Sequence, residues 1–168
     1  EVTRQVARAL EAAHAAGVVH RDVKPSNVFL SHEDGCVRPR LIDFGLAKLV
    51  AGAGGESSFD PLTGSGQLLG TPLYMSPEQV EGSGDADARS DVYSLGATLY
   101  HMLTGAPPFG DGPVARLLSR ILTEAPRPPG EVRTGLDPRV EAICLRCLRK
   151  LPGERWPTAG ALAEACGP

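Results

Sequence analysis

Apolar residues recur at helical spacing in several parts of the chain. Over residues 1–16, Val2, Val6 and Leu10 fall on one face of a predicted helix, and Gly17 follows where glycine often ends one. The same spacing predicts four further helices, over residues 90–104, 113–123, 137–150 and 158–166. Three of these have a residue suited to cap the N-terminus, namely Ser90, Asp137 and Thr158.

The β-strand signal is confined to one short region. Val28–Leu30 and Pro39–Ile42 are predicted strands, and Asp34-Gly35 is typical of the turn of a hairpin, which we place within residues 32–37. Two segments without any period, residues 46–76 and 81–89, are predicted loops. We therefore expect a mainly α fold with one small β-hairpin.

Length and charge exclude several classes of function. The chain has 168 residues, of which 42% are hydrophobic, and this is enough for one domain. Its net charge of −3 gives no electrostatic reason to expect a nucleic-acid partner. No apolar run approaches the roughly 18 residues of a membrane span, and no secretory leader is visible, so we expect no membrane segment in this chain and a cytoplasmic location. The first residue is Glu1 rather than Met, which suggests that the natural N-terminus is missing.

The Cys144-x-x-Cys147 pair lies inside a predicted helix. A zinc ribbon would need a second pair at similar spacing, and the sequence has none. We interpret both cysteines as small apolar residues of a helix, because free cysteine is usually buried. A redox or metal-binding role is the alternative.

Residues 20–27, His-Arg-Asp-Val-Lys-Pro-Ser-Asn, place an acid, a base and an amide directly before a strand. A merely solvated loop is one explanation. However, Asp22, Lys24 and Asn27 are spaced so that one loop can direct three polar groups to one point, and the hairpin should bring Asp43 back beside them. Oxygen ligands from Asn27 and Asp43 would suit Mg²⁺. The grouping favours Mg²⁺-assisted phosphoryl transfer, with a carboxylate close to the acceptor hydroxyl.

Four motifs in order resemble those of eukaryotic-like Ser/Thr protein kinases of the bacterial receptor-like type. His-Arg-Asp-x-Lys-x-x-Asn followed by Asp-Phe-Gly is similar to the kinase catalytic loop and metal-binding motif. Gly70–Glu78 is similar to the end of the activation segment, with Ser-Pro-Glu in place of Ala-Pro-Glu. Ser90–Gly96 resembles the start of the central helix of the C-terminal lobe, and Pro152–Trp156 a motif late in that lobe.

The resemblance covers the chain from Glu1 to about Cys166. It implies a partial protein kinase catalytic domain over residues 1–168, namely a protein-kinase-like C-terminal lobe, with the catalytic loop at residues 20–27 and the activation segment at residues 43–78. The implied activity is that of a transferase that moves the γ-phosphate of ATP to Ser or Thr hydroxyls of a protein substrate.

The resemblance also implies the catalytic roles. Asp22 would be the base that orients the substrate hydroxyl, and Lys24 would contact the γ-phosphate of ATP. Asn27 and Asp43 would hold Mg²⁺. Thr71 should bridge toward Asp22 and Lys24, and the presence of Lys24 and Thr71 favours a Ser/Thr rather than a Tyr substrate.

Four further residues are implied to be structural. His20 would pack beneath the catalytic loop, and Asp91 would hold the backbone of the His20-Arg21 turn. Glu78 and Arg155 would form a buried ion pair that anchors the activation segment, so that removing one partner would cost about 3–5 kcal/mol.

Arg21 suggests regulation by phosphorylation. In kinases with this arginine, a phosphate on the activation loop often pairs with it and orders the loop. Thr63 and Ser65 lie eight and six residues before Thr71, a placement similar to that of phosphorylated threonines in bacterial receptor-like kinases. We hypothesise phosphorylation at Thr63 or Ser65, with a plain polar loop as the alternative.

The N-terminal kinase lobe is absent from the sequence pattern. No Gly-x-Gly-x-x-Gly lies between two strands, and none of the three lysines, Lys24, Lys48 and Lys150, lies in a Val-Ala-x-Lys strand. We expect a kinase fragment that works when joined to its N-terminal lobe and is inactive alone. The alternative is a truncated substrate-binding or scaffold module. The lobe interface should expose apolar residues such as Phe44 and Leu46.

Overall fold

The computed structural model describes residues 1–33, 35–43, 72–82, 86–110 and 112–167. Most of these residues are helical, in agreement with the predicted mainly α fold, and a two-stranded sheet is the only sheet among them. The α-helices are α1 (Val2–Ala15), α3 (Pro77–Glu81), α4 (Ala88–Thr104), α5 (Val114–Thr123), α6 (Pro129–Val132), α7 (Pro138–Cys147) and α8 (Ala159–Ala165). Three short 3₁₀ turns are η1 (Pro25–Asn27), η2 (Pro72–Tyr74) and η3 (Pro152–Glu154).

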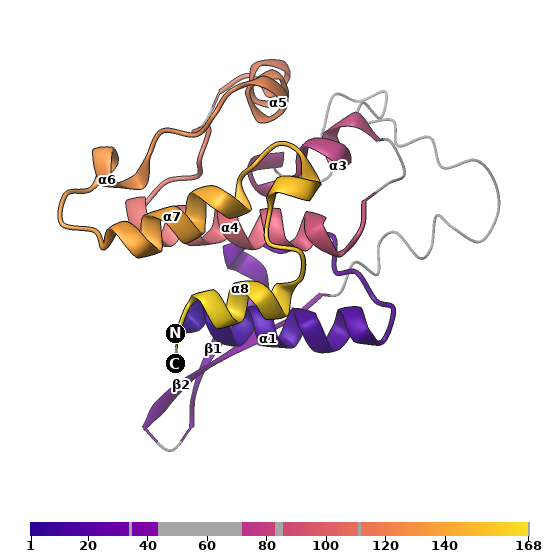
Figure 1. Cartoon of the computed structure of the whole chain (residues 1–168), viewed down its shortest axis with the longest axis vertical. Helices are drawn as coiled ribbons and strands as arrows, with labels where there is room; N and C mark the ends of the chain where they lie inside the picture. Colours follow the sequence, from indigo (N-terminus) through magenta and orange to yellow (C-terminus); the bar gives the residue numbers. More distant parts are fainter. Residues whose placement is uncertain (34, 44–71, 83–85, 111, 168) are drawn as a thin grey trace.

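Helix α4 is the centre of the molecule, and every residue from Ser90 to Tyr100 is buried. Figure 1 shows α7 running along α4, while α1 and α8 pack side by side and close the core beneath it. The main apolar cluster joins these helices through Val6, Leu10, Leu95 and Leu162, among others. The cluster also anchors residues 20–27, because Val23 of that loop is one of its members.

Helices α4 and α7 approach closely because both have small residues at the contact. A Cβ atom placed on Gly96 would collide with the Cβ of Cys147, so glycine is required there. Cys144 and Cys147 are buried and reduced, and burial raises the pKa of the Cys144 thiol to about 12. Within the described part of the chain no cluster of three or more metal-ligating side chains occurs.

The hairpin is longer than predicted. Strand β1 spans Val28–Glu33 and β2 spans Cys36–Leu41, with Val28 opposite Leu41 and Leu30 opposite Pro39. The predicted turn at residues 32–37 was too wide, because the chain reverses between positions 33 and 36 and Gly35 has a φ of 74°.

Two helix boundaries differ from the prediction, and one short helix was not predicted. Asp87, not Ser90, caps α4, since its carboxylate accepts a hydrogen bond from the N–H of Arg89. Helix α7 ends at Cys147 rather than at residue 150, because the carbonyls of Arg149 and Lys150 accept hydrogen bonds from the Arg155 side chain. The short helix α6 lies where a loop was expected. The caps of α7 and α8, Asp137 and Thr158, are as predicted.

None of the described helices is long and apolar enough to cross a lipid bilayer.

Candidate active site

The catalytic-loop candidate, residues 20–27, runs between α1 and β1 and is held from below by a buried carboxylate. Asp91, in the first turn of α4, has no exposed surface. Its Oδ2 atom accepts a hydrogen bond from the N–H of His20 at 2.8 Å, and its Oδ1 atom accepts one from the N–H of Arg21 at 2.7 Å. Its partners satisfy a charge that would otherwise be costly to bury.

Arg21 and Asp43 have strained backbones. Their φ angles are 65° and 59°, and they are the only non-glycine residues with positive φ in the described ranges. Such a conformation costs free energy for a residue with a Cβ, so other contacts must hold it in place. At Arg21 these contacts are the Asp91 carboxylate and the side-chain amide of Gln79, which donates to the Arg21 carbonyl at 2.8 Å.

His20 is buried beneath the loop and connects Asp22 to Ile42, the residue before Asp43. Its Nε2 lies 3.0 Å from the carbonyl of Ile42, and its Nδ1 lies 3.3 Å from the N–H of Asp22. A carbonyl can only accept and an N–H can only donate, so the neutral ring with its proton on Nε2 fits both contacts. The histidine thus fixes the position of Asp22 relative to the segment that leads to Asp43.

The structure brings Asp22, Lys24 and Asn27 together. The ammonium of Lys24 lies 2.7 Å from Oδ2 of Asp22. The side-chain amide of Asn27 donates to the same atom at 3.0 Å and to the backbone carbonyl of Asp22 at 2.8 Å. The Asp22 side chain is half exposed, and its Oδ1 accepts no hydrogen bond from any described residue. A carboxylate oxygen is therefore held in a fixed position and open to an incoming group.

Asp43 follows β2 and returns to the same loop. The N–H of Ile42 donates to the carbonyl of Asn27 at 2.9 Å, so the two segments are in direct contact. The Asp43 side chain is exposed and has no hydrogen bond to Asp22 or Asn27. The backbone contact agrees with the expectation that the hairpin returns Asp43 to residues 20–27.

The donor atoms of this site fit Mg²⁺. Because the Asn27 amide nitrogen is used within the loop, its oxygen is left without a hydrogen bond among the described residues. The Asp43 carboxylate is exposed. An amide oxygen and a carboxylate are oxygen ligands of the kind that Mg²⁺ prefers, with its remaining positions taken by water or phosphate.

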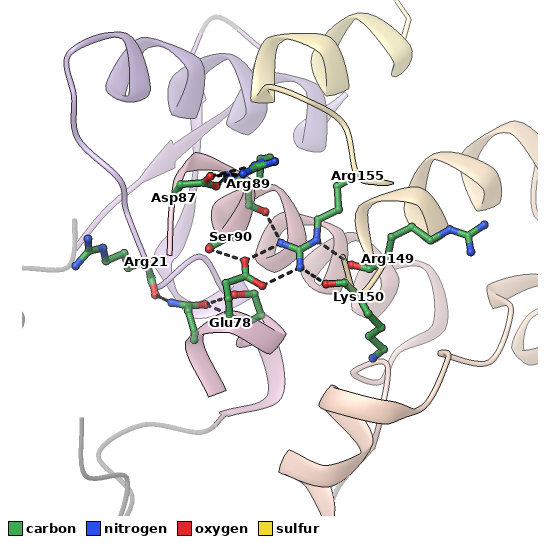
Figure 2. Close-up of polar contacts among 10 residues, drawn as sticks. Arg21, Glu78, Asp87, Arg89, Ser90, Arg149, Lys150 and Arg155 are labelled. Carbon is green, nitrogen blue, oxygen red and sulfur yellow. Dashed lines mark hydrogen bonds and ion pairs between the residues drawn. The ribbon is translucent and has the colours of Figure 1, made fainter. Parts of the chain in front are cut away.

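A buried ion pair lies behind the loop. Arg155 has no exposed side-chain surface and donates to both carboxylate oxygens of Glu78, at 2.7 and 2.8 Å. Figure 2 shows its guanidinium at the centre of a network that also reaches the backbone carbonyls of Arg89, Arg149 and Lys150. All five N–H donors of Arg155 are therefore used.

The Glu78 carboxylate remains ionised in this environment. Burial by itself raises its pKa, but hydrogen bonds from Arg155 and from the Ser90 hydroxyl outweigh burial and lower the pKa to about 2. Glu78 lies in the first turn of α3, and its neighbour Gln79 bonds to Arg21. The ion pair therefore fixes the short helix that touches the catalytic-loop candidate.

Three predicted site residues, Thr71, Thr63 and Ser65, lie outside the described residues, as do the predicted interface residues Phe44 and Leu46.

Two residues near the site were missed by the sequence analysis. His14 of α1 is a third partner of Asp91, with its Nε2 2.8 Å from Oδ2. Gln79 forms a capping box with Ser76 and also bonds to Arg21. The Ser-x-x-Gln spacing signals the capping box in the sequence. No local pattern signals His14, because its partner lies 77 residues away.

Comparisons with known proteins agree with the motifs. The family described as "Protein kinase domain" matches residues 1–165. The serine/threonine-protein kinase PkaA of Streptomyces coelicolor is 44% identical over 163 residues, which are 97% of this chain and 28% of PkaA. PknB of Mycobacterium tuberculosis is 40% identical over 96% of this chain and 24% of its own length. Pkn1 of Myxococcus xanthus is 41% identical over 98% of this chain and 23% of Pkn1.

A solved structure shows the same fold. The crystal structure of Rad53 1-466 in complex with AMP-PNP superposes with a TM-score of 0.74 and is 24% identical, over 99% of this chain and 38% of that chain. The chain spans about a quarter of the length of the curated relatives it matches. The chain belongs to the protein kinase family, in its bacterial eukaryotic-like Ser/Thr branch.

Proposed function

We propose that this chain is part of a Ser/Thr protein kinase that transfers the γ-phosphate of ATP to hydroxyl groups of a protein substrate. The observation that carries the proposal is the open Oδ1 of Asp22, on a loop that Lys24 and Asn27 fix from within and Asp91 fixes from below. The similarity to PkaA and PknB, which are serine/threonine-protein kinases, supports it. The site would act in the cytoplasm, where ATP is available.

Asp22 would orient the acceptor hydroxyl. Its Oδ2 is already occupied by Lys24 and Asn27, so the open Oδ1 would accept the hydrogen bond from a substrate Ser or Thr. That hydrogen bond directs the hydroxyl oxygen at the γ-phosphorus. Asp22 accepts the hydroxyl proton as the new oxygen–phosphorus bond forms and the bond to the bridging oxygen breaks, with ADP as the leaving group. Holding the hydroxyl in place supplies much of the rate enhancement in this class of reaction.

Lys24, Asn27 and Asp43 would bind the phosphates of ATP and the Mg²⁺ that accompanies them. Lys24 is part of the cluster and partly exposed, so its ammonium can contact a γ-phosphate oxygen without leaving Asp22. Asn27 and Asp43 would hold Mg²⁺, which neutralises charge on the phosphates when bound. Thr71 would bridge toward Asp22 and Lys24 and contribute to the preference for Ser and Thr.

We also propose that the chain acts as the C-terminal lobe of the kinase domain and needs an N-terminal lobe. The sequence has no Gly-rich phosphate loop and no strand lysine of the kind that a kinase uses to hold ATP. A groove of about 210 Å³ between α1, β1 and α4 is lined mainly by apolar side chains, including Val2, Leu30 and Met102. We assign this groove to contact with the N-terminal lobe, since Leu30 and Met102 are 48% and 44% exposed.

Arg21 fits the proposed regulation. Its backbone is held firmly, yet its side chain is exposed and has no hydrogen bond to the described residues. Figure 2 shows it pointing away from the Glu78–Arg155 network. A phosphate on Thr63 or Ser65 would give it a charge-assisted partner.

The test compares two polypeptides, this chain alone and the same chain joined to a kinase N-terminal lobe at Glu1. Each is incubated with Mg²⁺, γ-labelled ATP and casein, and phosphoserine and phosphothreonine are measured. We expect transfer only by the joined polypeptide. Transfer by the 168 residues alone would overturn the need for the second lobe. A folded joined polypeptide that binds casein without phosphorylating it would favour the scaffold alternative.

A further inference from the structure

A second cleft lies on α7, away from residues 20–27. It has a volume of about 620 Å³ and is lined by Ala142, Leu145, Arg146, Arg149 and Glu154. Ala142, Leu145, Arg146 and Arg149 fall at three- and four-residue spacings, so one face of the helix and the turn after it form its wall. Neither the phosphoryl-transfer site nor the Glu78–Arg155 pair uses these side chains.

The two arginines of the cleft, Arg146 and Arg149, have exposed side chains. Neither side chain forms an ion pair with a described residue, whereas Arg4, Arg89, Arg120 and Arg127 each pair with a nearby carboxylate. Figure 2 shows the guanidinium of Arg149 extending away from the network around Arg155. An arginine pair that forms no ion pair within the described chain is suited to an external anion.

Arg146 is also held in place. Its guanidinium lies 3.9 Å from the centroid of the Trp156 ring, and the indole N–H of Trp156 donates to the carbonyl of Ile143 at 3.4 Å. Stacking on an aromatic ring fixes the plane of a guanidinium but leaves its N–H edges free to donate. Such an arginine loses little side-chain entropy when it binds a carboxylate.

We propose that this cleft binds an acidic peptide segment of a partner protein, through the guanidiniums of Arg146 and Arg149. The apolar part of the wall, Ala142 and Leu145, would contact the stem of the acidic side chains. Glu154 also lines the cleft and favours a flexible acidic peptide over a nucleic acid, because glutamate side chains can turn away from it whereas phosphates are fixed in the nucleic-acid backbone.

The cleft is directly connected to the anchor of the candidate activation segment. The backbone carbonyl of Arg149 accepts a hydrogen bond from Nε of Arg155, the residue that holds Glu78. A peptide docked on α7 would thus be tethered to the same rigid unit that supports the catalytic-loop candidate. The binding itself does not depend on phosphoryl transfer, so failure of one proposal leaves the other testable.

The experiment uses the single tryptophan of the chain, Trp156, as the reporter. A hexaglutamate peptide is titrated into the 168-residue chain at low salt, and Trp156 fluorescence is followed. We expect a saturable change that weakens about tenfold in each of Arg146→Gln and Arg149→Gln, the loss of one charge-assisted hydrogen bond. Arg116→Gln, which removes an exposed arginine of α5, is the matched control and should bind as the wild type does.

Binding by peptide array or calorimetry repeats the titration without relying on Trp156, and circular dichroism confirms that each variant is folded. A hexalysine peptide should not bind. The proposal is overturned if hexaglutamate does not bind, if Arg116→Gln weakens binding as much as the cleft variants, or if a single-stranded oligothymidylate binds more tightly than the peptide.

Discussion

The Asp91 carboxylate holds the backbone N–H of Arg21 at 2.7 Å, where the chain has a φ of 65°. A buried residue of the central helix thereby stabilises a conformation that an arginine would rarely adopt alone. The same carboxylate binds the N–H of His20 and the ring of His14. The position of Asp22, the residue after Arg21, therefore depends on a contact between segments 70 residues apart.

Replacement of this carboxylate should be strongly destabilising. Asp91→Ala leaves the buried N–H of His20 and the part-buried N–H of Arg21 without an acceptor. We expect a loss of about 3 kcal/mol or more in the free energy of unfolding, measured by urea denaturation. Asp137→Ala removes an exposed helix cap by the same chemical change and should cost about 1 kcal/mol. Equal effects of the two substitutions would contradict the account of Asp91.

The Glu78–Arg155 pair should show strong coupling in a double-mutant cycle. Glu78→Gln and Arg155→Met each leave the partner buried without its counter-charge, and each should cost about 3–5 kcal/mol. The double variant should cost clearly less than the sum. Tyr93→Phe is a control in the same region, because the buried Tyr93 hydroxyl has no partner among the described residues and its removal should change stability little. Additive costs would show that the pair is not coupled.

Acid should weaken the fold through Glu78. Its pKa is about 2 in the folded chain, against an ordinary value of 4.5 for a glutamate in the unfolded chain, so the folded state binds fewer protons between these values. Its contribution, about 3 kcal/mol at most, is complete above pH 4.5 and is lost as the pH falls toward 2. We expect the difference in unfolding free energy between wild type and Glu78→Gln to shrink over that range. A difference independent of pH would rule out this linkage.

Activation by phosphorylation is a separate prediction. In an active polypeptide that contains both lobes, phosphopeptide mapping should find phosphate on Thr63 or Ser65. Arg21→Gln should then remove the activation that phosphorylation produces while leaving the basal rate of the unphosphorylated enzyme in place. An active enzyme whose loop carries no phosphate would contradict the hypothesis.

The sequence predicted the elements that are determined by residues close together in the chain. Periodicity placed the long helices, and the Asp-Gly pair placed the hairpin. Boundaries were wrong where a distant contact decided them: α7 ends early because Arg155 takes the carbonyls of Arg149 and Lys150, and Ser90 bonds to Glu78 instead of capping α4.

In the candidate site, too, contacts between neighbouring residues were predicted and contacts between distant residues were not. The spacing of Asp22, Lys24 and Asn27 predicted that their side chains meet, and in the structure they are in contact. The support from His14 and the link from Gln79 to Arg21 depend on residues that are adjacent only after folding, so no local pattern predicted them. The catalytic roles themselves stay predictions.

The most direct test of the proposed function is the Asp22→Asn variant of a polypeptide that contains both lobes. The substitution keeps the side-chain shape but removes the proton acceptor. We predict that the kcat for phosphoryl transfer to casein falls by about 10²–10⁴, while the affinity for ATP and Mg²⁺ and the unfolding midpoint change little. A variant that retains the wild-type kcat would contradict the assignment of this site as the centre of phosphoryl transfer.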